Sequence, residues 1–225
     1  MKYALLISTA YVTTLPSFPN REARIAQYVN GLMQIKELVD LHSEFDVFAV
    51  DNTVEHPELL DGRLIRAMQD IPNFKWTDFF WDNELGKKNK GAGLAIQWKH
   101  VLRKLPTEYR HVVHFEPRQN LINFSFFERF LAQPGNYFRV MKDWVMRGGV
   151  LPWHVTTIAT GMVAAETHVL RDYAEQASPQ KLVSQELSIE RDLYKFIRSR
   201  GIHYTDVPFL ELWWDNIATG EQIRL

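Results

Sequence analysis

Hydrophobic residues in the first part of the chain fall into short continuous runs separated by stretches of helical periodicity. Residues 2–9 and 45–50 are apolar runs, which is typical of strands buried on both faces. Between them, apolar residues recur at helical spacing over residues 21–41. This pattern predicts a β-α-β unit, in which a helix joins two parallel strands.

The same alternation continues along the next segment of the chain. The pattern predicts further strands at residues 74–81 and 111–115, and helices near residues 59–68 and 91–105. Alternating strands and helices are typical of a mainly parallel sheet with helices on both faces. We therefore expect an α/β fold.

Beyond residue 120 the pattern changes more often. It predicts a helix at 124–132, a short strand at 137–141, an apolar, Thr-rich stretch at 155–165, helices at 166–173 and 188–200, and an extended tail at 202–214. Ser188 is a favoured N-cap and Gly201 a favoured residue after a last helical turn, so they delimit one of these helices. No repeat or linker interrupts the chain, which predicts a single domain over residues 1–225.

The composition excludes several classes of protein. The 26 basic and 27 acidic residues are spread along the chain, so we expect no nucleic-acid partner. The absence of cysteine excludes disulfides and thiolate metal sites, and weakly favours a cytoplasmic protein. The apolar run at residues 3–8 is far shorter than the roughly 20 residues that cross a bilayer. Any action on a membrane component would take place at the membrane surface or through a partner.

Polar residues that follow strands are the first candidates for chemistry, because open parallel sheets bind ligands at the carboxyl ends of their strands. Residues 86–93 place Lys88, Lys90 and Gly91 at the start of a predicted helix. There, ammonium groups, backbone amides and the helix N-terminus can together hold a diphosphate. The segment has neither the Walker nor the dinucleotide glycine spacing, and a solvated, flexible loop is the other interpretation.

Charged and amide side chains also follow two of the predicted strands. Glu116 and Arg118 flank Pro117, whose fixed backbone would aim them at the sheet edge. An ion pair that closes the strand end is the alternative. Asp51 and Asn52 could bind a base or a ribose through paired hydrogen bonds, but both are also favoured turn residues.

Two further candidates lie near the end of the chain. Glu190 is in the first turn of the predicted helix at 188–200, and its carboxylate could act as a general base on a hydroxyl. The alternative is structural, because the helix dipole by itself favours an acidic residue in a first turn. Trp213, Trp214 and Asp215 could form a flat platform for a sugar with an acid beside it, whereas neighbouring aromatic residues more often belong to a core or an interface.

The order of these elements and candidates resembles that of the GT-A glycosyltransferases. These enzymes receive the nucleotide at the first strand and its loop, and place an Asp after the second strand. They carry a basic or Gly-containing segment before a central helix, and an acidic motif at the end of a central strand. The resemblance is one of order and covers most of the chain. It implies a nucleotide-binding half (residues 1–120), an acceptor-side half (residues 121–225), a nucleotide-sugar donor and a glycan-type acceptor, as in polysaccharide biosynthesis.

Carried over to this sequence, the resemblance implies a role for each candidate. The base and ribose would lie near Thr9, Ala10, Asp51 and Asn52, and the diphosphate would face Lys88, Lys90 and Gly91. The acceptor side would be lined by Thr160 and Gly161. Glu190 would be the base of an inverting displacement, with Asp192 near enough to replace it.

The sequence departs from the family in its acidic motif. It contains no Asp-x-Asp, and Glu116 and Arg118 offer one carboxylate and one cation where two carboxylates are expected. The expected Mn²⁺ or Mg²⁺ is therefore in question. Glu116 would be its ligand if a metal binds, with Asp82 and Glu84 as a less favoured pair. Otherwise Arg118 and the lysines could neutralise the diphosphate.

Two other functions fit the same pattern. A nucleotidyltransferase shares the nucleotide site, but would be expected to carry a Gly- and Arg-rich loop soon after the first strand, and the loop here has no Gly. A binding protein that keeps the GT-A-like fold without catalysis would explain the missing acidic pair.

Overall fold

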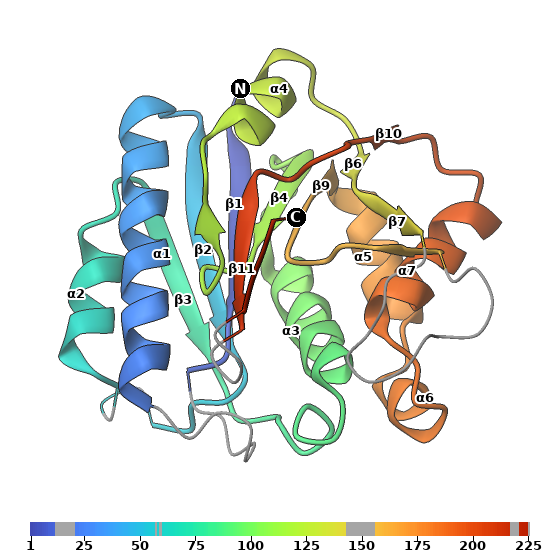
Figure 1. The fold of residues 1–225 in the computed structure, drawn as a ribbon, viewed down its shortest axis with the longest axis horizontal. Coiled ribbons are helices and arrows are strands. Elements are labelled where there is room, and N and C mark those ends of the chain that lie inside the picture. The colour runs from blue at the N-terminus through green and yellow to red at the C-terminus, as the bar shows by residue number, and fades with distance from the viewer. Residues whose placement is uncertain (12–20, 57, 59, 143–155, 217–220, 225) are drawn as a thin grey trace.

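Four segments form the parallel part of a seven-stranded sheet. A computed structural model of the chain describes residues 1–11, 21–56, 58, 60–142, 156–216 and 221–224. The strand order is β10-β6-β9-β4-β1-β2-β3 (Figure 1). Four neighbouring strands run parallel: β1 (Tyr3–Thr9), β2 (Phe45–Asp51), β3 (Phe74–Phe79) and β4 (His111–Phe115). The predicted α/β fold with a mainly parallel sheet is confirmed.

Shorter strands complete the sheet and add two small ones. β9 (Met162–Glu166) is antiparallel to β4 and to β6 (Tyr137–Phe138), and β10 (Thr205–Asp206) is parallel to β6. A separate antiparallel pair is formed by β7 (Val140–Lys142) and β8 (Thr156–Ile158). A three-stranded antiparallel sheet joins β5 (Asn120–Leu121), β11 (Leu212–Asn216) and β12 (Glu221–Arg224).

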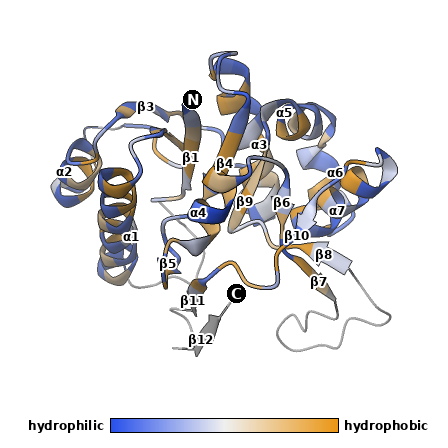
Figure 2. Cartoon of the chain, turned by 90° about the horizontal axis from the view of Figure 1, so that it is seen from above, coloured by the Kyte–Doolittle hydropathy of each residue, from blue (hydrophilic) through white to orange (hydrophobic). Residues whose placement is uncertain are grey.

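Helices cover both faces of the main sheet, as the alternation of elements predicts. One group consists of α1 (Arg21–Leu41), α2 (Gly62–Gln69) and α4 (Ser125–Ala132), and the other of α3 (Lys90–Lys104), α5 (Thr167–Gln176), α6 (Pro179–Ser184) and α7 (Ile189–Ser199). Leu5 packs with the first group and Leu6 with the second, because successive side chains of a strand point to opposite faces. Figure 2 shows the hydrophobic strands between the two groups.

Local signals determine where α3 and α7 begin. The Asn89 side chain accepts a hydrogen bond from the Ala92 amide at 3.2 Å, and the Ser188 hydroxyl accepts one from the Arg191 amide at 3.2 Å. Such N-cap bonds satisfy amides that have no partner within the helix. Gly201, with φ of 61°, follows the last turn of α7, so both predicted ends of this helix are confirmed.

The elements that differ from the sequence prediction are short. β3 ends at Phe79, two residues before the predicted end, and the stretch predicted at 155–165 contains β8, a turn and β9. The six-residue helix α6 was not predicted, because so short a segment carries little periodicity.

Candidate functional site

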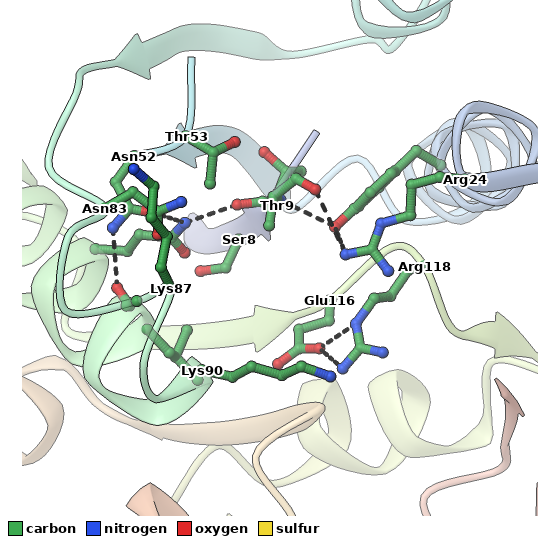
Figure 3. A pocket seen from close by; sticks show the side chains of 16 residues that line it. Ser8, Thr9, Arg24, Asn52, Thr53, Asn83, Lys87, Lys90, Glu116 and Arg118 are labelled. Atoms are coloured by element: carbon green, nitrogen blue, oxygen red, sulfur yellow. Dashed lines mark hydrogen bonds and ion pairs between the residues drawn. The ribbon is translucent and has the colours of Figure 1, made fainter. Parts of the chain in front are cut away.

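A cleft opens where β1, β2 and β4 end. These strands are parallel, so their carboxyl ends meet at one edge of the sheet. The cleft encloses about 740 Å³ of open space, including the solvent at its mouth. The described residues that line it come from β1, α1, α3 and the loops after β1, β2, β3 and β4: Ser8, Thr9, Ala10, Arg24, Tyr28, Asn52, Thr53, Asn83, Gly86, Lys87, Lys90, Gly93, Leu94, Gln97, Glu116 and Arg118 (Figure 3).

Asp51 lies fully buried behind the cleft and organises its loops. One carboxylate oxygen accepts hydrogen bonds from the Thr9 hydroxyl at 2.8 Å and the Tyr11 amide at 2.9 Å. The other accepts from the amide and the hydroxyl of Thr53, both at 2.6 Å. Burial raises the pKa of Asp51, although these four bonds oppose the shift. Its side chain does not line the cleft, and its contact with a nucleotide stays a prediction.

Asn52 lines the cleft, with its amide engaged by neighbouring segments. Its nitrogen donates to the Asp82 carbonyl at 2.7 Å, and its oxygen accepts from Gln97 at 2.8 Å. Gln97 also donates to the Thr9 carbonyl at 2.6 Å. These bonds connect β1, the loops after β2 and β3, and α3, and they support the position of Thr9 and Ala10 in the cleft wall. A contact of Thr9, Ala10 or Asn52 with a base stays a prediction.

Glu116 and Arg118 form an ion pair inside the cleft, as Figure 3 shows. The Arg118 Nε and one terminal nitrogen lie 2.9 and 2.8 Å from the same Glu116 oxygen. Burial is the largest single influence and raises the pKa of Glu116, but the charge and hydrogen bond of Arg118, together with the charges of His114 and Arg24, outweigh it and lower the pKa of this carboxyl. Glu116 is therefore a paired carboxylate.

Two more cations approach this pair from different helices. Lys90, the first residue of α3, is exposed along its side chain, but its ammonium reaches toward Glu116 and Arg118 (Figure 3). Burial, and then the charges of Arg118 and Arg24, lower the pKa of Lys90 to about 8. Arg24 comes from α1, and its guanidinium lies 5.1 Å from the centre of the Tyr28 ring. Sequence reasoning missed Arg24, because a single arginine in an amphipathic helix carries no signal for a cleft.

The other residues of the predicted diphosphate loop point elsewhere. Lys88 is exposed and does not line the cleft, whereas the neighbouring Lys87 does. The Lys87 ammonium pairs with Glu84 at 2.7 Å and lies 5.0 Å from the centre of the Trp81 ring. Gly91 packs against α7, where a Cβ atom would come within 2.9 Å of Ile189. Of the three predicted loop residues, only Lys90 lines the cleft.

A turn between β8 and β9 connects two carboxylates, and its residues Thr160 and Gly161 are those predicted to line the acceptor side. The Thr160 hydroxyl donates to Glu190 at 3.1 Å, and the Gly161 carbonyl accepts from the Glu116 amide at 2.9 Å. Burial raises the pKa of Glu190, and the Glu116 charge adds to this effect while the Thr160 hydrogen bond opposes it. A carboxylate with a raised pKa is suited to accept a proton near neutral pH.

Of the remaining predicted residues, Asp192 and Trp213 are not among the described residues that line the cleft. Asp192 accepts a hydrogen bond from the Tyr173 hydroxyl at 3.2 Å, between α5 and α7. Trp213 is 37% exposed, and its backbone pairs with Asn120 in β5, close in sequence to Arg118. Trp214 and Asp215 belong to β11, but their side chains lie outside the described part of the structure.

The described residues by themselves supply few ligands for a divalent metal ion. Within the described ranges, no group of three or more His, Asp or Glu side chains is placed to hold one. Glu116 is the sole carboxylate among the described cleft-lining residues, and Arg118 binds one of its oxygens. Mg²⁺ and Mn²⁺ favour several oxygen ligands.

Among the described helices, none is long and apolar enough to span a membrane.

Comparisons with known proteins support the fold. No family model matches the chain, and no curated protein matches it in sequence. The structure is similar to 4-diphosphocytidyl-2C-methyl-D-erythritol synthase from Anaerococcus prevotii, with a TM-score of 0.56 and 10% identity over 92% of this chain and 86% of that one. It is also similar to a protein from Desulfovibrio desulfuricans described as a nucleotide-diphospho-sugar transferase, with a TM-score of 0.51 and 11% identity over 92% of this chain and 80% of that one. The chain has a GT-A-like fold, as the order of its elements predicted.

Proposed function

We propose that this protein is a glycosyltransferase, which moves a sugar from a nucleotide diphosphate to a hydroxyl group of a glycan-type acceptor. The observation that carries the proposal is the arrangement around the cleft: Lys90 and Arg118 line it, and Glu190, which is not among the described cleft-lining residues, accepts a hydrogen bond from the neighbouring turn at Thr160. The turn at Thr160 and Gly161 connects the two sides. The GT-A-like fold supports the same assignment.

In the proposed reaction, the acceptor hydroxyl attacks the anomeric carbon of the sugar while the bond from that carbon to the diphosphate oxygen breaks. Glu190 takes the proton of the hydroxyl. Because the hydroxyl attacks in a single step on the face opposite to the leaving diphosphate, the displacement inverts the anomeric centre. The cations stabilise the charge that develops on the leaving diphosphate. Trp213, with Trp214 and Asp215, is proposed to contact the acceptor. Asp192 is the second candidate for the base, but its bond with Tyr173 holds it between helices.

A thermal-shift panel of UDP-, GDP-, CMP- and dTDP-sugars tests donor binding. At least one donor should raise the melting temperature, because a ligand that binds only the folded state stabilises it. Lys90→Ala should lose most of that shift. Lys88→Ala, measured beside it, decides whether the exposed lysine contributes. No shift with any donor would contradict the proposal and favour a protein without this activity, and a shift with nucleoside triphosphates alone would favour a nucleotidyltransferase.

Donor affinity is expected to fall as the pH rises through about 8, where Lys90 loses its proton. Below that pH the ammonium is charged, and a bound diphosphate favours the charged form, so binding and proton uptake are linked. Above it, the affinity should decrease by at most about tenfold per pH unit, because one proton is taken up. Lys90→Arg keeps its charge over the whole range and should remove this slope in calorimetric titrations. Identical profiles for the two proteins would exclude Lys90 from the site.

A further inference from the structure

Three cationic side chains from three separate elements converge in the cleft. Arg24 extends from α1, Lys90 from the start of α3 and Arg118 from the loop after β4, and all three line the cleft (Figure 3). The charges of Arg118 and Arg24 both act on the Lys90 ammonium. We call these residues the cation triad.

Local contacts orient Arg24 toward the end of β1. It is 7% exposed, and one of its terminal nitrogens lies 3.4 Å from both the Ala10 carbonyl and the Tyr28 hydroxyl. The Tyr28 hydroxyl in turn accepts a hydrogen bond from the Ala10 amide at 2.9 Å. Both of these acceptors of Arg24 are neutral, so they orient the guanidinium without cancelling its charge.

The charges of the described cleft-lining residues match a diphosphate that carries a substituent at each end. The triad supplies three positive charges, Glu116 supplies one negative charge, and Lys87 is paired with Glu84 outside the triad. The diphosphate of a nucleotide sugar carries two negative charges, which equals the net positive charge of the triad and Glu116. A divalent cation in addition would bring two more positive charges close to the triad, and such repulsion is costly in a partly buried cleft.

We propose that Arg24, Lys90 and Arg118 together bind the diphosphate of the donor and provide the charge neutralisation for which other enzymes use a divalent metal ion. This proposal rests on the proposed function, because it assumes a diphosphate ligand. Arginine suits the role, since its planar fork donates two parallel hydrogen bonds to phosphate oxygens.

Calorimetric titration with inorganic pyrophosphate and with UDP, GDP and CDP, in EDTA and in Mn²⁺, tests the cation triad. We expect binding in EDTA with at least one of these ligands. Arg24→Met should weaken it by about 10- to 100-fold, as for the loss of a charge-assisted hydrogen bond. Arg21→Met is the matched control, because Arg21 lies one turn earlier on α1, is exposed, and does not line the cleft. Arg24→Lys, which keeps the charge, should retain part of the affinity, and a melting curve of each variant checks its fold.

Three results would overturn the proposal for the cation triad. These are ligand binding that occurs only in Mn²⁺, no ligand binding in either EDTA or Mn²⁺, or equal ligand affinity of Arg24→Met and the Arg21→Met control. Binding only with Mn²⁺ would leave the proposed glycosyltransferase intact. Metal-free binding of pyrophosphate that depends on Arg24, combined with no response to any nucleotide sugar, would support the triad and contradict the proposed function. The two proposals therefore fail on different results.

Discussion

Glu190→Gln is expected to lower turnover by about 10²- to 10⁴-fold, the usual contribution of positioned proton transfer, and to leave donor binding unchanged. The amide has nearly the same shape as the carboxylate and can still accept the hydrogen bond from Thr160. It cannot take a proton from the acceptor. Turnover of the unchanged protein should also fall as the pH decreases through the raised pKa of Glu190, because the base must be deprotonated.

Steady-state kinetics over a range of pH, with donor affinity measured separately, checks this prediction. Asp192→Asn is the matched control: Asp192 is in the same helix, but its carboxylate contacts Tyr173 between α5 and α7. We expect this variant to keep most of its turnover. If Glu190→Gln kept near-native turnover while Asp192→Asn lost it, the proton acceptor would be Asp192.

Gly31→Ala is expected to destabilise the fold and disturb the cleft together. A Cβ atom at Gly31 would lie 1.7 Å from the Pro117 carbonyl oxygen and 2.6 Å from the carbonyl carbon. Both atoms belong to the backbone, so α1 or the turn that carries Glu116 and Arg118 must move. Overpacking of this kind typically costs about 1–3 kcal/mol of unfolding free energy, and a contact this short places the variant at or above the upper end. Movement of the turn should also weaken diphosphate binding.

Urea unfolding and calorimetric titration of the same samples test both parts of this prediction. Gly62→Ala is the matched control, because the nearest atom to its added methyl group would be a flexible Arg66 nitrogen at 3.9 Å. This change should be neutral or slightly stabilising, since alanine restricts the unfolded chain more than glycine does. Equal stability of the two variants would show that α1 does not press on the turn at Pro117.

The sequence alone determined the parallel part of the sheet and the edge where polar residues gather. Apolar runs separated by amphipathic helices specify parallel strands, and parallel strands end at a common edge. Glu116 and Arg118 follow β4 at the edge where Asp51 ends the parallel strand β2, but Asp51 lies buried behind the cleft that they line. The limits of α7 were also predictable, because Ser188 and Gly201 act on the backbone next to them.

Only the tertiary structure decided which side chains meet at that edge. The donors to one Asp51 oxygen are 40 and 42 residues away in sequence, and Thr160 and Glu190 are separated by 30 residues. Periodicity shows which side of a helix is buried, but not which charged group a neighbouring element brings to it. Arg24 therefore had no signal in the sequence, although it lies beside Lys90 and Arg118 in the cleft. Local patterns specify the elements, and the packing of distant segments specifies the site.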